Sequence, residues 1–265
     1  MGFQYEIKIF EPMCKLKKQI FSYMERLLAR STDKIICISE AERMSALKHK
    51  IADNEKLEVI LNGIDFTAIE NAIPAKRKDL NIPENAFVVG MIGRISEQKA
   101  PDIFIKAAKK IQEEIPNSYF IIIGDGEKKQ EIEEYAQKNN INLFISGWTD
   151  NPYSYLKIFD IAMLLSRWEG FGLAIVEYMA AKKNFVATKT DAIPTIVRNG
   201  KDGILVNVDA PTEAANAVIF LYKNKDIAEN MKKEAWEYAH KRYDIQRVAE
   251  QHLKLFKSIT YIKSL

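Results

Sequence analysis

The chain has 265 residues, of which 47% are hydrophobic and 28% charged, proportions typical of a globular protein. Its 39 Lys and Arg against 36 Asp and Glu leave a net charge of only +3, so we expect no nucleic-acid partner. Two cysteines, Cys14 and Cys37, are too few for a disulfide framework, and no run of about 18 apolar residues predicts a membrane span. We therefore expect a cytoplasmic protein.

Short β-rich runs alternate with amphipathic helical patterns along most of the chain. Strands are expected at 34–38, 57–61, 87–92, 119–123, 143–145, 161–165, 185–188 and 204–206. Helices are expected at 12–30, 40–50, 68–80, 101–115, 127–139, 152–158, 172–182, 211–223, 226–241 and 244–264. The alternation predicts an α/β fold, a Rossmann-like parallel sheet with helices on both faces.

The ligand of such a sheet binds beyond the carboxyl ends of the strands, so the loops that follow them are candidate sites. The loop after 87–92 contains Gly93, Arg94 and Lys99. The two cations suit phosphate oxygens, although they could also be solvated surface charges. Gly124 and Gly126 follow 119–123 and lead straight into a helix, where they indicate either an anion site or a plain turn.

Two further loops carry candidate binding residues. After 143–145 come Gly147 and Trp148, and the indole either packs on a nucleobase or caps the edge of the sheet. After 161–165, Glu169 precedes two glycines at the start of a helix, where unpaired amides of about 171–173 suit a phosphate. Glu177, about one turn later, could accept hydrogen bonds from a ribose diol. The structural alternative is that Glu169 only caps the helix and that Glu177 is an exposed helical residue. The expected ligand-binding residues of this helix start are Gly170, Phe171, Gly172, Leu173 and Glu177.

Together these loops offer cations and amides for a diphosphate, and none has the spacing of metal ligands. We therefore expect no metal ion and no cofactor, and a site that stabilises a leaving group.

These residues resemble the signature of glycosyltransferase family 4, retaining enzymes of the GT-B fold. The family's Glu-(x)7-Glu motif reads Glu169 to Glu177 here, with Gly-Phe-Gly after the first acid. The Gly-Arg…Lys loop at 93–99, the Gly-Asp-Gly turn at 124–126 and the Asn-Gly-Ile-Asp segment at 62–65 also match, as do Asp160 and Ser166.

The resemblance implies a role for each matched residue. Arg94 and Lys99 would hold the diphosphate, Glu177 the ribose and Glu169 the donor sugar, with Arg94, Lys99 and Glu169 as the catalytic residues. The implied reaction transfers a sugar from a nucleotide-diphosphate sugar, expected to be a UDP-sugar, to an acceptor hydroxyl with retention. The implied acceptor is a glycan or a lipid-linked molecule, in cell-surface polysaccharide or glycan synthesis.

The resemblance also implies a division into domains. Residues 1–60 would be a remnant of the acceptor-side N-terminal domain, 61–243 the nucleotide-sugar-binding domain, and 244–265 a helix crossing back toward the first. The family's N-domain His has no counterpart, because His49, His240 and His252 fall in expected helices and Met1-Gly2-Phe3 lacks the His of a His-Gly-aromatic loop. We expect this chain alone to bind nucleotide but to transfer sugar poorly.

The chain departs from the family pattern at two places. Lys182-Lys183-Asn184 stands where the family has Gly-x-Pro, and the segment 191–195, Asp-Ala-Ile-Pro-Thr, replaces Gly-Gly-x-Pro-Glu. These changes leave the donor-sugar contacts of that loop open, and they indicate either a different donor or relaxed selection.

Helix 12–30 places five basic residues among apolar ones. It is typical of a helix on an anionic membrane surface, or of an N-domain helix left uncovered. Three alternative functions remain open: a glycosidase using the two glutamates, a sugar-nucleotide epimerase, and a non-catalytic nucleotide-sugar-binding fragment or degenerate gene product.

Overall fold

Six strands form one parallel sheet in the order β5-β4-β3-β6-β7-β8, in a computed structural model that describes residues 15–263. The strands are β3 Phe87–Ile92, β4 Ser118–Ile123, β5 Leu143–Ile145, β6 Ile161–Leu164, β7 Asn184–Thr188 and β8 Ile204–Val206. The apolar runs of β4, β6 and β7 are buried on both faces, as strands between two helical layers must be. The predicted α/β class is confirmed.

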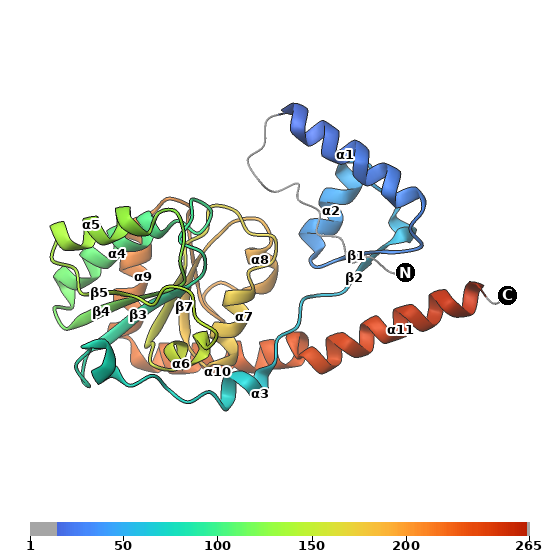
Figure 1. Cartoon of the computed structure of the whole chain (residues 1–265). Helices are drawn as coiled ribbons and strands as arrows, with labels where there is room; N and C mark the ends of the chain where they lie inside the picture. Colours follow the sequence, from blue (N-terminus) through green and yellow to red (C-terminus); the bar gives the residue numbers. More distant parts are fainter. Residues whose placement is uncertain (1–14, 264–265) are drawn as a thin grey trace.

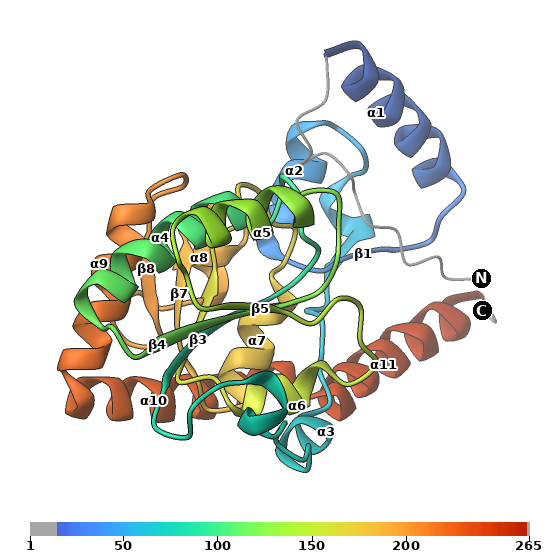
Figure 2. The same cartoon turned by 60° about the vertical axis from the view of Figure 1, so that its left-hand side comes forward.

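Helices cover both faces of this sheet (Figures 1 and 2). One hydrophobic core lies under α4 Pro101–Glu114, α5 Lys129–Lys138 and α9 Pro211–Lys223. The other lies under α3 Phe66–Glu70, α6 Pro152–Lys157, α7 Leu173–Ala180 and the second half of α10 Lys225–Tyr243.

The sheet has a switch point between β3 and β6. From β3 the chain proceeds outward through β4 and β5, then returns to β6 and proceeds the other way. The two central strands pair at only two positions, Val89 with Ile161 and Gly90 with Ala162, so their carboxyl ends diverge. Tyr178 of α7 fills the gap: its hydroxyl accepts from the Ile92 amide at 3.0 Å and lies 3.4 Å from the Met163 carbonyl.

The N-terminal elements form a small separate unit. They are α1 Lys15–Arg30, β1 Ile35–Cys37, α2 Glu40–Lys48, the 3-10 turn Asn54–Lys56 and β2 Leu57–Val59, with β1 and β2 paired in parallel around their own core. The long helix α11, Ile245–Lys263, extends from the sheet unit past this one (Figure 1). Val248 of α11 packs with Ile36 and Ile60. Met1-Gly2-Phe3 and the first turn of the helix expected at 12–30, with Cys14, lie outside the described residues.

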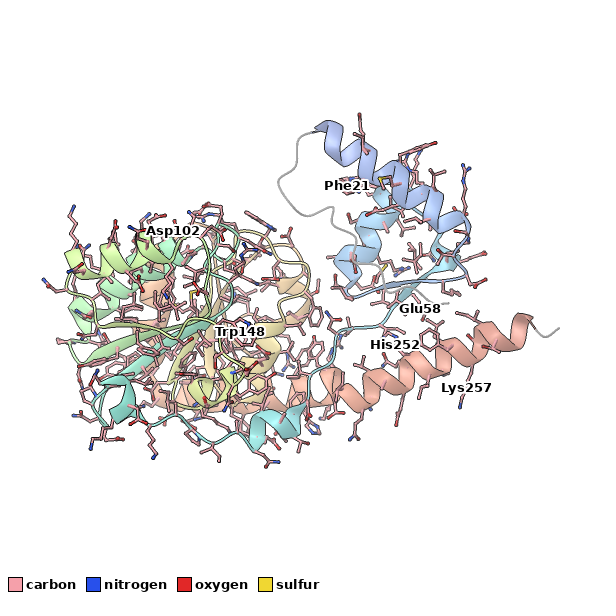
Figure 3. All side chains as sticks on the ribbon, viewed as in Figure 1. Phe21, Glu58, Asp102, Trp148, His252 and Lys257 are labelled. Atoms are coloured by element: carbon pink, nitrogen blue, oxygen red, sulfur yellow. The ribbon has the colours of Figure 1, made fainter. Side chains whose placement is uncertain are left out.

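Helix α1 packs through its small and polar side. Ser22, Glu25 and Ala29 are buried, and burial next to Glu42 raises the pKa of Glu25 to about 7. The large apolar side chains are exposed instead; they are Ile20, Phe21, Tyr23, Met24, Leu27 and Leu28. Phe21 is labelled in Figure 3. No helix among the described residues is long and apolar enough to cross a membrane.

Two local expectations were wrong. The helix expected at 68–80 is a short α3 that ends at Glu70 and a separate 3-10 turn, Arg77–Leu80. Pro74 lies between them, and a proline disfavours helical backbone in the residue before it. A one-turn helix, α8 Ile193–Ile196, was not expected because it is too short to show a period.

Candidate functional site

A line of glycines crosses the carboxyl edge of the sheet. Gly93 and Gly124 directly follow β3 and β4, and Gly147 lies one residue further beyond the end of β5. Gly124 and Gly147 form an isolated antiparallel β-bridge. All three have positive φ angles, of 154°, 142° and 69°. A Cβ on Gly124 would lie 2.2 Å from the Gly93 carbonyl oxygen, and one on Gly126 2.5 Å from that of Ile95. Side chains are therefore excluded where the two loops pack backbone against backbone.

Lys99 and Glu169 meet in front of the switch point. The Lys99 Nζ donates to Glu169 Oε2 at 2.5 Å, and the Ser166 hydroxyl donates to the same oxygen at 3.1 Å. Both members of the ion pair are largely removed from solvent, with exposed side-chain fractions of 18% and 10%. The sequence predicted both residues for the site, but not that they pair. Within the part of the chain that the structure describes, Glu169 Oε1 and two of the three N–H bonds of the lysine remain available for a ligand.

The two loops that carry this pair are joined along their backbones. The Arg167 amide donates to the Gln98 carbonyl at 2.8 Å, and the Gln98 side chain donates to the Trp168 carbonyl at 3.1 Å. This double connection holds the loop after β3 against the loop after β6. It is the local reason that Lys99 lies on Glu169.

Arg167, which the sequence did not single out, holds the same loops through its side chain. Its guanidinium pairs with Glu97 at 2.7 Å and with Asp102 and Asp209 at 2.8 Å each. Burial alone would raise the pKa of Asp102, but the hydrogen bonds and charge of Arg167 outweigh it and lower that pKa. No sequence signal marked Arg167, because its three acidic partners lie 42 to 70 positions away in the chain.

The start of α7 presents backbone amides. Gly172 is the N-cap residue in left-handed conformation, with a φ of 93° and no side-chain cap. Within the described chain, no backbone or side-chain acceptor binds the amides of Gly170, Phe171 or Gly172. The Phe171 ring is buried against Tyr243, so its backbone alone faces the site, while Leu173 is exposed. Amides with this helix behind them form a suitable anion site.

Glu177 lies further along α7, close enough to Lys99 for their charges to interact. We call the region between the loops after β3 and β6 and the start of α7 the crevice. Its Oε1 accepts a hydrogen bond from the Tyr153 hydroxyl at 3.2 Å. Burial raises the pKa of Glu177, against the Tyr153 hydrogen bond and the charge of Lys99. Burial and Glu177 raise the pKa of Tyr153 to about 12, so the phenol stays a donor. Tyr153 was not predicted, since nothing in its neighbourhood distinguishes it from a core aromatic residue.

Arg94 and Trp148 extend into solvent on the rim. Arg94 is 74% exposed and forms an ion pair with Glu127 at 3.3 Å. Trp148, which is labelled in Figure 3, has 76% of its surface exposed, so it does not cap the edge of the sheet. Both side chains can therefore move onto a ligand at little cost.

Asp191, in the segment that departs from the family pattern, and Asp160, which matches it, have different structural roles. Asp191 has a φ of 41°, in the region that favours glycine, and its Oδ2 accepts from the Glu169 amide at 2.9 Å. Asp160, in contrast, joins β6 to β3: its carboxylate accepts from the Val88 amide at 2.7 Å. Asp191 therefore borders the crevice, whereas Asp160 is structural.

The N-terminal unit faces this crevice. The Ser39 hydroxyl, just after β1, lies 3.4 Å from the carbonyl oxygen of Gly170. The loop between Glu169 and α7 therefore lies between the two units.

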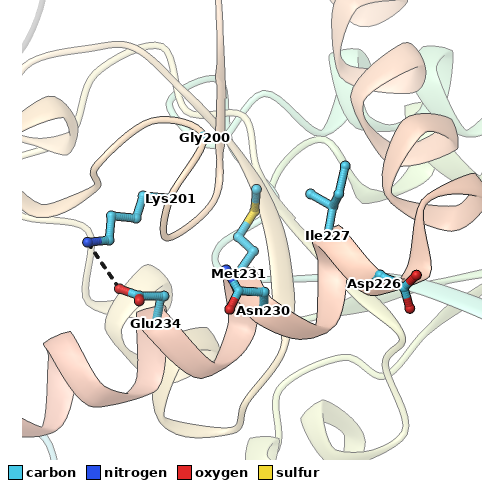
Figure 4. Close-up of a pocket in the computed structure, with 7 residues that line it drawn as sticks. All are labelled: Gly200, Lys201, Asp226, Ile227, Asn230, Met231 and Glu234. Carbon is cyan, nitrogen blue, oxygen red and sulfur yellow. Dashed lines mark ion pairs between the residues drawn. The ribbon is translucent and has the colours of Figure 1, made fainter.

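Other concave features lie away from these loops. A hollow of about 350 Å³ is lined by Gly200, Lys201, Asp226, Ile227, Asn230, Met231 and Glu234 (Figure 4). Its Lys201 and Glu234 pair at 3.2 Å, and it shares no residue with the crevice. Among the described residues, no group of three or more His, Cys, Asp or Glu is placed to hold a metal ion.

Arg167→Met should lower the free energy of unfolding by about 2–3 kcal/mol at neutral pH, because Asp102 loses its cation in a poorly solvated place. Since the pKa of Asp102 is lowered in the folded state, this stabilisation is present above its ordinary pKa of about 3.9 and disappears as the pH falls through the lowered value. Urea unfolding at several pH values measures the difference from wild type.

Arg94→Met is the matched control, because an exposed ion pair contributes at most about 1 kcal/mol. If both variants lost the same free energy of unfolding, the ion pairs of Arg167 would not be a special source of stability.

The chain matches known proteins in sequence and in fold. The family model "Glycosyl transferases group 1" matches residues 72–238. The Escherichia coli UDP-Gal:alpha-D-GlcNAc-diphosphoundecaprenol alpha-1,3-galactosyltransferase is 31% identical over 220 residues, covering 80% of this chain and 57% of that protein. The Staphylococcus aureus poly(ribitol-phosphate) alpha-N-acetylglucosaminyltransferase is 27% identical over 244 residues, covering 90% and 47%. The chain thus spans about half the length of these relatives.

Solved structures show the same fold. Anabaena HepE in complex with UDP and glucose superposes with a TM-score of 0.85 at 22% identity, covering 96% of this chain and 71% of that one. The C-terminal domain of the Francisella tularensis glycosyl transferase group 1 protein LpcC has a TM-score of 0.62 at 25% identity, and covers 69% and 100%. The expected resemblance is confirmed: the chain belongs to the glycosyl transferases group 1 family, with the fold of the GT-B glycosyltransferases.

Proposed function

We propose that this chain is the donor-binding part of a retaining glycosyltransferase that transfers a sugar from a UDP-sugar to an acceptor hydroxyl. The observation that carries the proposal is the Lys99–Glu169 ion pair beside the unpaired amides of Gly170–Gly172 at the switch point. This arrangement puts cation, amide donors and carboxylate where open α/β sheets bind their ligands.

The diphosphate would lie between Lys99 and the start of α7. As the bond from the sugar to the diphosphate breaks, negative charge grows on the leaving oxygens. Lys99, the α7 amides and Arg94 would stabilise this charge, which lowers the barrier to transfer. Arg94 must leave Glu127 to do so, and an exposed ion pair allows this easily.

The other parts of the donor would be held by neighbouring groups. The nucleobase would lie on the exposed Trp148 beside Gly147, and the ribose at Glu177, which is close enough to Lys99 for their charges to interact. Glu169 would accept sugar hydroxyls through its Oε1. The Lys99 pairing of Glu169 argues against a glycosidase, whose two carboxyl groups act as acid and base or nucleophile.

The acceptor would approach from the N-terminal unit. We propose that residues 1–60 belong to an acceptor-side domain, 61–243 to the donor domain, and 244–265 to a helix that returns to the first. The match to the complete LpcC C-terminal domain and the packing of Val248 on Ile36 support this division. Relatives named for a diphosphoundecaprenol sugar and for poly(ribitol-phosphate) support a lipid-linked or glycan acceptor in cell-surface polysaccharide synthesis.

Calorimetric titration of the chain with UDP-, GDP- and ADP-sugars tests the donor. We expect binding of at least one UDP-sugar in preference to the others, with little transfer to added acceptors by the chain alone. Absence of binding to all three classes would refute the function. Robust transfer by the chain alone would contradict the expected poor transfer and would exclude a non-catalytic nucleotide-sugar-binding protein.

Arg94→Ala should weaken the binding of the preferred nucleoside diphosphate by about 1.5–3 kcal/mol, the contribution of a charge-assisted hydrogen bond. Binding of the corresponding nucleoside, without phosphates, should be unchanged. Arg43→Ala, which removes another partly exposed guanidinium in the N-terminal unit, is the control. Equal affinity of the Arg94 variant and wild type for the diphosphate would show that this loop does not contact it.

We also propose that α1 contacts the inner surface of an anionic membrane. Its exposed apolar side chains and its basic residues would act together on anionic lipids. Co-sedimentation with vesicles should rise with the fraction of phosphatidylglycerol and fall in a Met24→Gln/Leu27→Gln variant. Ile73→Gln, at another exposed apolar position, should have no effect. Binding independent of anionic lipid would favour a helix that packs against protein.

A further inference from the structure

Tyr153 contacts Glu177, and the proposed function gives this tyrosine no role. It is the second residue of α6, a helix that begins at Pro152 after the loop from β5. From there its hydroxyl reaches across to α7 and donates to Glu177 Oε1 at 3.2 Å. The two residues are 24 positions apart and lie on different helices, α6 and α7.

We propose that Tyr153 is a positioning residue that sets the orientation of the Glu177 carboxylate for a ribose diol. This inference rests on the proposed function, since it assumes that Glu177 binds ribose. A glutamate has three rotatable bonds, and two adjacent hydroxyls can be accepted together only if both carboxylate oxygens face them. The hydrogen bond from Tyr153 fixes Oε1, which keeps a second lone pair for one ribose hydroxyl, and Oε2 can accept from the other. A Glu177 carboxylate that is already held in place before the ligand binds costs less conformational entropy on binding.

The place of Tyr153 in the chain supports this role. The same connection that ends in Tyr153 begins with Gly147 and the exposed Trp148. Base and ribose are covalently joined, so one short segment would contact the base at one end and orient the ribose ligand at the other. The phenol also stays protonated, because the pKa of Tyr153 is raised to about 12.

Lys99 acts on the same carboxylate from the opposite connection. Its charge is felt by Glu177, while its ammonium is already paired with Glu169. Among the described residues, the Tyr153 hydroxyl is the side-chain donor that hydrogen-bonds Glu177. Removing it should therefore free the carboxylate without disturbing the diphosphate site.

The test is a cycle between one protein change and one ligand change. Tyr153→Phe keeps the ring in the core and removes the hydroxyl alone. We expect it to weaken UDP binding by up to about tenfold, because the freed Glu177 side chain must then be ordered when the ligand binds, which costs about 0.5–1.5 kcal/mol for one side chain. With 2′,3′-dideoxy-UDP, which offers no diol, wild type and variant should bind within about twofold of each other, a result that a general structural defect would not give.

Tyr155→Phe is the matched control. Tyr155 lies on the same helix and stacks on Phe144, and its hydroxyl makes no hydrogen bond within the described residues. This variant should bind both ligands as wild type does. If Tyr153→Phe binds UDP as tightly as wild type, or loses equal affinity for both ligands, Tyr153 does not act through the ribose. If wild type itself binds no nucleoside diphosphate, the proposed function fails first, and the two failures remain distinguishable.

Discussion

The crevice depends on the meeting of Lys99 and Glu169, two residues 70 positions apart. Because β3 and β6 pair at only two positions and then diverge, the loops that follow them open toward each other. A lysine and a glutamate brought together in this poorly solvated place stabilise each other's charge, whereas either alone would be costly to bury. The hydrogen bonds of Arg167 and Gln98 hold the two loops in register, so that the ion pair forms without help from a ligand.

Most polar groups around the ion pair form hydrogen bonds that fix the positions of Glu169, Glu177 and the central strands. Ser166 and Asp191 hold Glu169 by its side chain and its amide, Tyr153 holds Glu177, and Tyr178 closes the gap between the diverging strands. Among the described residues, the amides of Gly170–Gly172 have no hydrogen-bond partner, Trp148 is exposed, and Arg94 is held by an exposed ion pair with Glu127. Rigid groups inside and mobile groups on the rim suit a ligand with a fixed diphosphate and a base that enters from solvent.

The N-terminal unit is built differently from the sheet unit. Its two strands and two helices enclose a small core, while α1 presents its apolar side chains outward. Contacts with the rest of the chain include Val248 of α11, Ser39 near Gly170, and Ile38, which is buried in the core under α7. These contacts bring the end of β1 to the loop between Glu169 and α7, and they explain why a helix far along the chain passes close to its beginning.

The sequence by itself determined the α/β class, the six central strands and the strand-end loops in which Lys99 and Glu169 lie. These are local properties: apolar runs, glycines at strand ends, and a carboxylate before a helix start can all be read within a few residues. Even the errors were local, as at Pro74 and the four-residue α8. Only the tertiary structure decided that Lys99 pairs with Glu169, that Tyr153 reaches Glu177, and that Arg167 joins three acids. Those contacts depend on strand order and on where β3 and β6 part, which no short stretch of sequence contains.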